Sequence, residues 1–386
     1  MQIQQAQQTA KQQINARYAL LIGDLHFGRR SNDQQELEIS EEYFHRFVFP
    51  ELEKLNGQYG QENVMVIQLG DVYDNRSVIN VEVQNRVLDI FARLSQTNET
   101  IVLVGNHDKF NETNATTKAL SFIPNVITVD RPMTLYAQDK TLTCLPAIEK
   151  RDRLQELITG LEPSDYLFGH DDIAGFAHEG VPVSEDKAVS VSLFEKFGRC
   201  FFGHIHKFQS RHNVVYVGSA YQTRINEARN DYPRLTVLDL QSGSIQFIEN
   251  TVTPRYYKVL LDDVLEATLE DIQQKYTGQR LIVYCRPSDF VRYQLYKITE
   301  LLSTVLYSVV YKQLNEKETN TDDGEIVTEA VQRSLEEDLT DYIDSLDSEV
   351  VSKTLVSFTP PLKERLKKTL KRLYTEATEK TKEVEI

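Results

Sequence analysis

The chain has 386 residues, of which 40% are hydrophobic and 26% charged, and a formal net charge of −15. That length predicts two or three domains, and no apolar run approaches the roughly 18–20 residues that cross a bilayer, so we expect no membrane association. The acidic balance argues against a protein that coats nucleic acid with its whole surface, although a local basic rim is compatible with it. Several basic residues of the N-terminal two thirds, close in sequence to the histidine-containing segments described below, could form such a rim: Arg29, Arg30, Arg76, Lys109, Lys207, Arg211 and Arg224.

Residues 1–17 are polar and rich in Gln, without the apolar segment of a secretory signal, and we expect a frayed lead-in to the first domain. The three cysteines Cys144, Cys200 and Cys285 are scattered and odd in number. They predict buried thiols in a reducing compartment, which we expect to be the cytoplasm.

Five segments of the N-terminal two thirds share one pattern, an apolar run followed by Gly and then by Asp, Asn or His. Short apolar runs rich in β-branched and aromatic residues are typical of strands that are buried on both faces. The glycine marks a sharp turn or the close approach of another group. The segments are 18–26, 64–74, 101–108, 166–172 and 200–206.

Between these segments, residues 38–55, 83–94 and 150–161 carry apolar residues at the three-to-four spacing of helices. Strand, polar tip, helix and strand in alternation predict a layered α/β fold. Ligands of such folds bind beyond the carboxyl ends of the strands, where the polar tips would meet. Residues 213–221, 234–240 and 244–250 lack intervening helices and are expected to add antiparallel strands.

The C-terminal third has a different organisation. Residues 255–313 predict a small α/β cap domain with the order β-α-β-α-β, and residues 314–327 predict an acidic linker. Residues 328–380 predict two amphipathic helices, the second beginning at Pro360 and Pro361. Such a pair commonly docks on a partner. The alternative is that the pair folds back on the same chain. The basic residues of the second helix could also form a solvated face or contact DNA.

The five polar tips together offer oxygen and nitrogen ligands without a thiolate, a set that suits Mn, Fe, Zn or a similar divalent ion. If residues 204–206 are extended, His204 and His206 point the same way. The set is too large for one tetrahedral site and predicts two neighbouring ions, with Asp71 as the natural bridge because it has two oxygens. Its members are Asp24, His26, Asp71, Asn106, His107, His170, His204 and His206.

In order, the tips read DLH, GDVYD, GNHD, GHD and GHIH, and over about residues 18–220 they resemble the calcineurin-like metallophosphoesterases. The resemblance implies a layered β-sandwich flanked by helices, with residues 18–254 as the catalytic domain. It assigns one ion to Asp24, His26, Asp71 and His206. It assigns the second ion to Asp71, Asn106, His170 and His204. It also implies that His107 faces the scissile phosphate and that Asp108 orients it.

The chemistry expected from this arrangement is hydrolysis of a phosphoester. A single zinc ion already lowers the pKa of bound water to about 7, so a water bridging two cations would provide a hydroxide for in-line attack on phosphorus. His107, when protonated, would stabilise the transition state or protonate the leaving alkoxide. The sequence contains neither G-x-S-x-G nor G-x-x-x-x-G-K-[ST], which disfavours serine hydrolases and P-loop ATPases.

Within this family, three longer stretches resemble the SbcD-type DNA repair nucleases, especially the recombination endonuclease subunit of tailed phages: GDLHFG, FGHDDIAGF and YVGSAYQTRINEARNDYPRLTVLDL. This resemblance implies a Mn²⁺-dependent exonuclease on double-strand ends and endonuclease on single strands. It implies a DNA-binding cap, an SMC-like ATPase partner with a coiled coil, and a dimer of nuclease subunits. Asp74 follows the bacterial and phage pattern, since eukaryotic and archaeal members have a histidine there.

Two alternatives stay open on the sequence alone. One is a nucleotide or small-molecule phosphodiesterase with an unrelated C-terminal extension, and the other is a scaffold that has lost turnover. Among the remaining residues, Asp74 is expected to cap its turn or to orient a ligand. His178 is expected to be a loop histidine that could also touch substrate, whereas His45 and His212 are expected to have no catalytic role.

Overall fold

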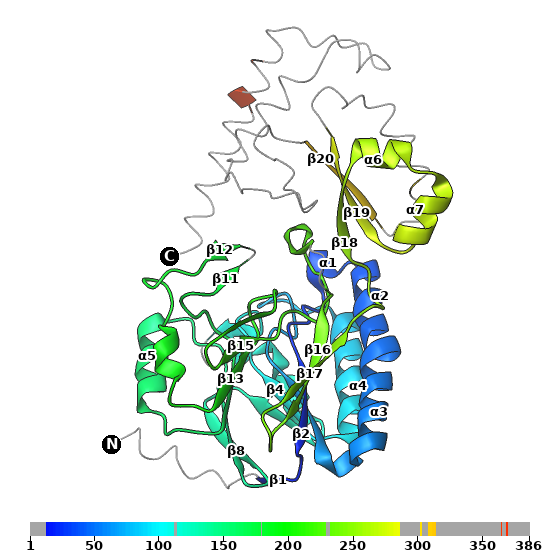
Figure 1. Cartoon of the computed structure of the whole chain (residues 1–386). Coiled ribbons are helices and arrows are strands. Elements are labelled where there is room, and N and C mark those ends of the chain that lie inside the picture. The colour runs from blue at the N-terminus through cyan, green and yellow to red at the C-terminus, as the bar shows by residue number, and fades with distance from the viewer. Residues whose placement is uncertain are drawn as a thin grey trace. The chain divides into compact units, whose positions relative to one another are not determined.

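The computed structural model describes residues 13–285, apart from 112–113, 179 and 229–231, and then residues 302, 308–313, 364 and 368–369 (Figure 1). The described chain falls into two compact units. The first unit contains residues 13–257 together with 273–282, and the second contains residues 258–272 and most of the described residues beyond 282.

One sheet of the first unit has six strands. In spatial order they are β17 (Ile245–Glu249), β16 (Arg234–Asp239), β2 (Tyr18–Ile22), β3 (Val64–Gln68), β4 (Thr100–Leu103) and β7 (Val126–Val129). The last four run parallel. β16 is antiparallel to both β2 and β17, so residues 234–240 and 244–250 do add antiparallel strands as expected.

The second sheet of this unit has seven strands. They are β1 (Gln13–Ile14), β8 (Met133–Ala137), β9 (Lys140–Cys144), β10 (Tyr166–Gly169), β13 (Arg199–Phe202), β15 (Val214–Tyr216) and β14 (Gln209–Arg211). β9, β10, β13 and β15 are parallel. Within residues 213–221, β15 pairs antiparallel with β14, as expected, and also parallel with β13, because the hairpin of β14 and β15 reverses the chain once more.

The inner faces of the two sheets share one apolar core. Side chains alternate along each strand, so Ala19 and Leu21 of β2 enter this core, whereas Leu20 and Ile22 face the opposite side. Phe201 of β13 belongs to the same core, stacked against a neighbouring ring with the centroids 5.8 Å apart. Burial on both faces explains why these strands are nearly uninterrupted apolar runs.

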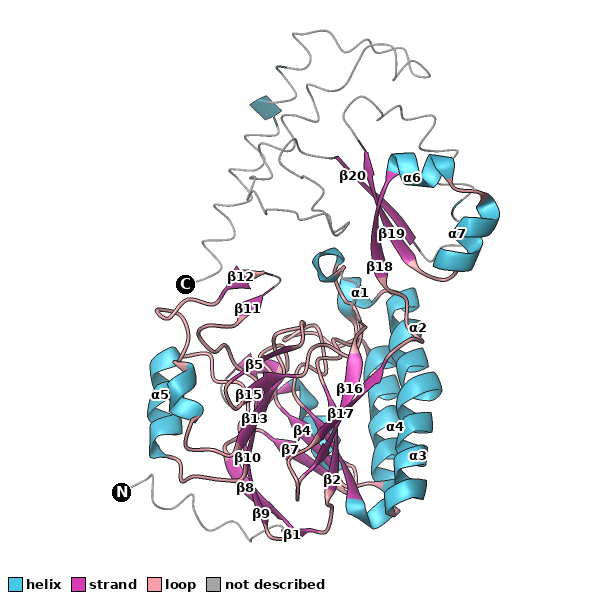
Figure 2. Cartoon of the chain, viewed as in Figure 1, coloured by secondary structure: helices cyan, strands magenta, loops and turns pink. Residues whose placement is uncertain are grey.

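Helices cover both outer faces of the sandwich (Figure 2). α2 (Gln34–Tyr43), the π-helix η2 (Phe44–Val48), α3 (Phe49–Tyr59) and α4 (Val81–Thr97) pack on the six-stranded sheet. α5 (Arg151–Gly160) and the short η5 (Val191–Phe194) pack on the seven-stranded sheet. The helix expected at 38–55 spans three pieces because the π turn interrupts it. The layered α/β sandwich predicted from the sequence is confirmed.

Short elements complete the first unit, and one of the expectations about it was wrong. Residues 13–17 are part of the sandwich rather than a frayed lead-in, since Ile14 is buried and β1 pairs in parallel with β8. The remaining elements are α1 (Arg29–Asn32), η3 (Gln61–Asn63), β5 (Lys109–Asn111), β6 (Asn114–Ala115), η4 (Thr116–Phe122), β11 (Ala177–His178), β12 (Val181–Pro182) and η6 (Ile225–Glu227).

A buried ion cluster lies within the first unit. Glu36 of α2 accepts from Arg29 at 2.7 Å and from Arg280 at 2.6 Å, and all three residues are at most 3% exposed. Arg30, about half exposed, reaches the same carboxylate at 3.1 Å. Although burial opposes ionisation, the charges of Arg29 and Arg280 keep the pKa of Glu36 below its ordinary value.

After the sandwich, β18 (Tyr256–Leu260), β19 (Arg280–Cys285) and β20 (Ser308–Gln313) form a three-stranded sheet. α6 (Leu261–Glu266) and α7 (Leu269–Tyr276) lie between the first two strands in sequence, where the sequence indicated a single helix. The expected linker at 314–327 lies outside the described residues. So do the expected C-terminal helices, except residues 364 and 368–369, which are helical.

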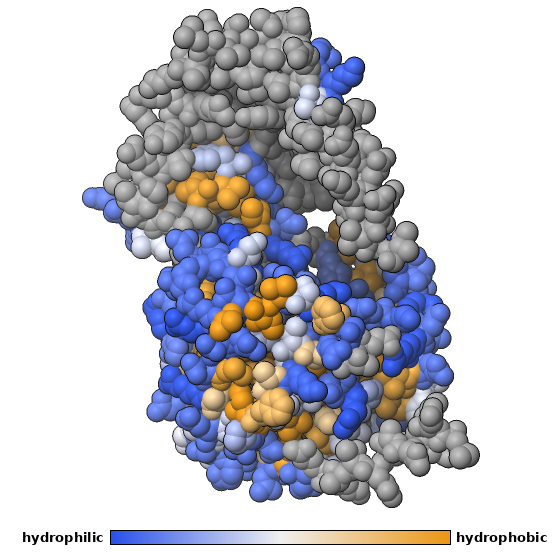
Figure 3. All heavy atoms as spheres, turned by 180° about the vertical axis from the view of Figure 1, so that it is seen from behind, coloured by the Kyte–Doolittle hydropathy of each residue, from blue (hydrophilic) through white to orange (hydrophobic). Residues whose placement is uncertain are grey.

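The three cysteines are buried thiols outside any disulfide, as expected. Within the described ranges, none of the helices has both the length and the apolarity to span a membrane. Seen from behind, the described surface is mostly hydrophilic, with a few hydrophobic patches (Figure 3).

Candidate metal centre

The polar tips of five strands, three from one sheet and two from the other, meet at one place in the sandwich. Each tip begins within four residues of the end of its strand: β2 and β3 and β4 in the six-stranded sheet, and β10 and β13 in the seven-stranded sheet. Groups of these side chains bring their ligand atoms within 4.8 Å of one another. The sequence therefore identified residues that the fold gathers: Asp24, His26, Asp71, Asn106, His107, His170, His204 and His206.

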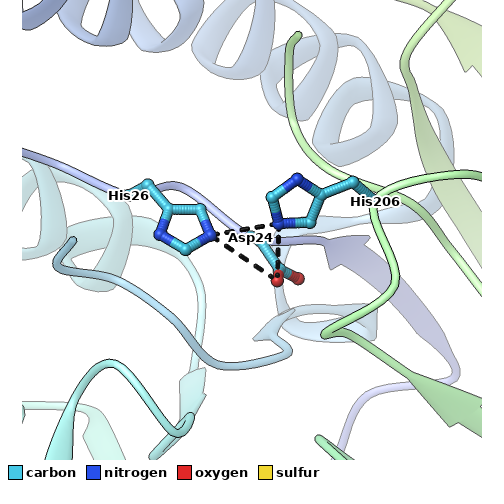
Figure 4. Close-up of side chains that lie close together, drawn as sticks. All are labelled: Asp24, His26 and His206. Atoms are coloured by element: carbon cyan, nitrogen blue, oxygen red, sulfur yellow. Dashed lines mark hydrogen bonds and ion pairs between the residues drawn. The ribbon is translucent and has the colours of Figure 1, made fainter. Parts of the chain in front are cut away.

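The first group contains Asp24, His26 and His206 (Figure 4). The Nε2 atoms of the two histidines lie 3.1 Å apart, and Asp24 Oδ2 lies 3.9 Å from His26 Nε2 and 3.5 Å from His206 Nε2. Asp24 is fully buried, and the backbone N–H of His204 donates to both of its oxygens at 3.0 and 3.1 Å. With both imidazoles neutral, as metal binding requires, their Nε2 lone pairs and a carboxylate oxygen of Asp24 converge on one point.

The second group contains Asp71, His170 and His204. His170 Nε2 lies 3.2 Å from Asp71 Oδ1 and 3.0 Å from the amide oxygen of Asn106. Its Nδ1 donates to the carbonyl of Leu69 at 2.7 Å, which directs the lone pair of Nε2 towards the group. Although burial opposes protonation, Asp71 and Asp24 raise the pKa of His170 to about 10.

Asp71 joins the two groups. Its Oδ1 faces His170 at 3.2 Å, while its Oδ2 faces His26 at 3.7 Å. The backbone N–H of His107 also donates to Oδ1 at 2.8 Å and so fixes the carboxylate plane. Gly105 must be glycine here, because a Cβ at this position would overlap Asp71. One carboxylate thus offers one oxygen to each side, as a bridging ligand requires.

Left-handed backbone at three of these residues supports the assignment of a site. The backbone angle φ is 48° at His26, 56° at Asp71 and 80° at His204, although residues other than glycine rarely adopt positive φ values. Such conformations cost on the order of 1–3 kcal/mol each and cluster where function needs a particular side-chain direction. The fold therefore holds these ligands in place against a local conformational cost.

His206 has a partner that the sequence analysis missed. Its Nδ1 lies 2.6 Å from Oε1 of Glu227, a residue only 2% exposed. Thr223 donates its backbone N–H at 2.7 Å and its hydroxyl at 2.6 Å to the same carboxylate. Burial opposes protonation of His206, but Glu227 and Asp24 raise the pKa of His206 to about 10. Glu227 lies 21 residues downstream, inside the stretch 216–240 that resembles the nucleases, but nothing in that stretch marked this residue as a partner of His206.

His107 lies beside the first group, with its ring 4.9 Å from that of His26, but Asp108 does not orient it directly. Asp74 does so instead, through its backbone carbonyl, which accepts from His107 Nδ1 at 2.6 Å. The buried carboxylate of Asp108 accepts backbone N–H groups of Gly105, Val72 and Tyr73 at 2.9 to 3.1 Å. Asp108 therefore ties together the loops after β3 and β4.

Asp74 has a second role, which agrees with the expectation that it orients a ligand. Its Oδ1 lies 3.2 Å from Nδ1 of His26. Burial opposes ionisation, but the hydrogen bond to His26 lowers the pKa of Asp74. On the other side of the centre, Asp172 lies 2.6 Å from Nε2 of His178 and 3.5 Å from Nε2 of His204. His178 thus contacts Asp172, which lies next to the proposed ligand His204. His45 and His212 are exposed and belong to none of these groups.

The donor set fits two divalent cations. It combines imidazole nitrogens, carboxylates and one amide oxygen. In His170, His26 and His206 the second ring nitrogen contacts Leu69, Asp74 and Glu227 respectively. Asp24, His26, His206 and Asp71 would hold one ion. Asp71, Asn106, His170 and His204 would hold the other.

Comparisons with known proteins agree with this geometry. Residues 19–208 match the family of calcineurin-like phosphoesterases. A viral protein named "Putative phosphoesterase 078R", from Invertebrate iridescent virus 3, is 27% identical over 248 residues, and the match covers 59% of this chain and 65% of the relative. A solved archaeal phosphodiesterase matches 60% of this chain and 99% of its own length at 15% identity, and its TM-score of 0.30 is too low to support an argument.

Fold, site and family match define the class of the first unit. Residues 19–208 belong to the calcineurin-like metallophosphoesterase family. The site in this domain carries groups of side chains that suit divalent metal ions.

Proposed function

We propose that this protein is a metal-dependent DNA nuclease, which cleaves phosphodiesters at the centre described above. The observation that carries the proposal is the position of Asp71, with one oxygen 3.2 Å from His170 and the other 3.7 Å from His26. This arrangement suits two ions rather than one. Bound there, two divalent cations would activate a water for attack and neutralise the oxygens of the phosphoryl group.

His107 is the residue that we propose to move a proton. Its Nδ1 donates to the carbonyl of Asp74, so Nε2 is the nitrogen at which a proton is gained or lost. Burial lowers the pKa of His107, although Asp71 opposes this effect. A protonated His107 therefore releases its proton readily, as a general acid facing the leaving oxygen of a diester must do.

DNA is the proposed substrate because of the sequence beyond the metal ligands. The stretches GDLHFG, FGHDDIAGF and YVGSAYQTRINEARNDYPRLTVLDL resemble the SbcD-type nucleases, and a small α/β sheet, β18 to β20, follows the sandwich in the order that this resemblance implies. On the same ground we propose exonuclease activity on double-strand ends, endonuclease activity on single strands, Mn²⁺ as the metal, a dimer of nuclease subunits, and an SMC-like ATPase as partner.

A nuclease assay on the full-length chain tests the proposal. With Mn²⁺, the protein should shorten a linear duplex and cut a circular single strand, and EDTA should abolish both activities. Asp71→Asn is the matched variant, because it keeps the shape of the side chain and removes the shared negative charge. Hydrolysis of mononucleotide esters without any cleavage of DNA would overturn the proposal in favour of a small-molecule phosphodiesterase.

The proposed partner needs a separate experiment. The chain should co-purify with an ATPase that carries a long coiled coil when the two are expressed together, and ATP should change the rate of duplex degradation. Nuclease activity that is the same with and without the ATPase would overturn the partnership and leave the nuclease assignment standing.

A further inference from the structure

Two neighbouring hollows lie beside the metal centre within the first unit. Next to the centre, a hollow of about 260 Å³ is lined by three of the proposed ligands, Asn106, His170 and His204. A second hollow, of about 450 Å³, shares Arg76, Ile148 and Glu149 with the first. Because they share these walls, the two hollows are neighbours, and we call them together the groove.

The walls of this groove are basic although the chain is acidic. The two hollows are lined by seven cationic residues and four acidic ones, whereas the whole chain carries a net charge of −15. The cations are Arg76, Lys109, Arg131, Lys150, Arg151, Arg153 and Lys187, and the acids are Asp130, Glu149, Asp171 and Asp172. Arg76 pairs with Glu149 at 3.2 Å, but both are about half exposed, and such a pair is weak enough to yield to a phosphate.

An exposed aromatic ring stands among these cations. Phe110 lies three residues after His107, lines the second hollow, and is 61% exposed. Large exposed aromatic rings are unusual on an otherwise polar wall, and bases of a single strand stack on such rings whatever their sequence. A duplex offers no unpaired base for this contact. Cations for phosphates and a ring for bases are together the features of a single-strand path.

We propose that this groove binds the single-stranded polynucleotide that leads away from the scissile phosphate. Phe110 stacks on a base, while Arg131 and Arg153 contact backbone phosphates. The proposal rests on the nuclease function proposed above and adds to it a binding site and its strand preference. It also explains how an acidic protein holds a polyanion, since the positive charge is concentrated along one groove.

Binding of a fluorescent oligothymidine to the full-length chain tests the groove. Phe110→Ala should weaken binding about tenfold, which is within the range for loss of one stacked base. The double variant Arg131→Ala with Arg153→Ala should reduce the slope of log affinity against log salt by about 1.4, since each phosphate contact on a single strand contributes about 0.7. Phe122→Ala and Arg46→Ala, both exposed and away from the groove walls, should bind as the unaltered protein does.

Two comparisons separate this inference from the proposed function. In turnover, Phe110→Ala should lower the ratio of kcat/KM on the oligonucleotide to kcat/KM on bis(p-nitrophenyl) phosphate about tenfold. If the unaltered protein cuts DNA and the groove variants bind oligothymidine as tightly as it does, the groove is overturned and the nuclease function stands. If the unaltered protein neither binds nor cuts DNA yet hydrolyses the small diester, both fall. If Phe110→Ala weakens binding of a duplex as much as binding of oligothymidine, the single-strand preference is overturned.

Discussion

Nδ1 of His206 lies 2.6 Å from Oε1 of Glu227, and this contact joins the loop that follows β13 to η6. Because Nδ1–H donates to the carboxylate, the neutral form of His206 has its lone pair on Nε2, the atom that faces Asp24. Glu227 is held in turn by two donors from Thr223. The orientation of one proposed metal ligand thus depends on a residue outside the five metal-ligand motifs.

The first prediction concerns this contact. Glu227→Gln should weaken metal binding about 10- to 100-fold, because a carboxylate partner both orients a ligating histidine and increases its basicity. Isothermal titration with Mn²⁺ measures the effect. Glu249→Gln, an exposed carboxylate on β17, is the matched control and should titrate like the unaltered protein. Equal affinity in the two variants would contradict the role given to Glu227.

A second prediction separates a shared ligand from an unshared one. Asp24 faces the first group alone, whereas Asp71 has one oxygen towards each group. Asp24→Asn should therefore lose one of two bound equivalents of Mn²⁺, and Asp71→Asn should weaken both. Metal analysis after desalting, together with thermal melts to confirm folding, gives the stoichiometry. Loss of a single equivalent from Asp71→Asn would show that it does not bridge.

The sequence predicted the membership of the site better than its local geometry. His204 and His206 were expected to share a direction because they are two apart in an extended segment. β13 in fact ends at Phe202, and φ at His204 is 80°, so a left-handed turn rather than a strand separates the two rings. They serve different groups, as expected, but periodicity of a strand is not the reason. Short motifs fix residue identity, whereas the backbone at a site is set by the loops packed around it.

The roles of carboxylates were harder to predict than those of histidines. Asp108 was expected to orient His107, yet it organises backbone N–H groups, and the carbonyl of Asp74 has that task. A carboxylate next to a catalytic residue in sequence can point into the loop instead. Glu227 shows the converse, a distant carboxylate brought into contact by the fold. The layers of the sandwich were predictable because their apolar periodicity extends over whole strands and helices.

A third prediction follows from the charges of the metal-free centre. Neighbouring carboxylates raise the pKa values of His170 and His206 to about 10, so both are protonated at neutral pH without metal. Ligation requires the neutral form, so binding must release protons and the affinity for Mn²⁺ must rise from pH 6 to pH 8. Titrations in buffers of different ionisation enthalpy count the protons released. Binding that is independent of both pH and buffer would contradict this.

The buried cluster around Glu36 gives a fourth prediction. Glu36→Gln leaves Arg29 and Arg280 buried without a counter-charge, which should lower the free energy of unfolding by about 3–5 kcal/mol. Urea denaturation measures it. Glu42→Gln is the control, since its pair with Arg46 is about half exposed and worth at most about 1 kcal/mol.

The same cluster should make stability depend on pH. The folded pKa of Glu36 is lower than its unfolded value, so its contribution is complete above the unfolded pKa of about 4.3 and is lost as the pH falls through the folded pKa. Acidification in that range should therefore destabilise the unaltered protein more than Glu36→Gln. Parallel acid unfolding curves would contradict the ion-pair account.

The last prediction separates catalysis from metal binding. The Nδ1 of His107 is held by the carbonyl of Asp74, and its ring lies 4.9 Å from that of His26, so it is close to the centre without being needed as a ligand. His107→Ala should lower kcat by about 10² to 10⁴, the usual contribution of a general acid, while two equivalents of Mn²⁺ stay bound. His45→Ala, an exposed histidine on η2, should keep full activity. Unchanged cleavage by His107→Ala would remove this residue from the mechanism, and loss of an equivalent of metal would make it a ligand instead.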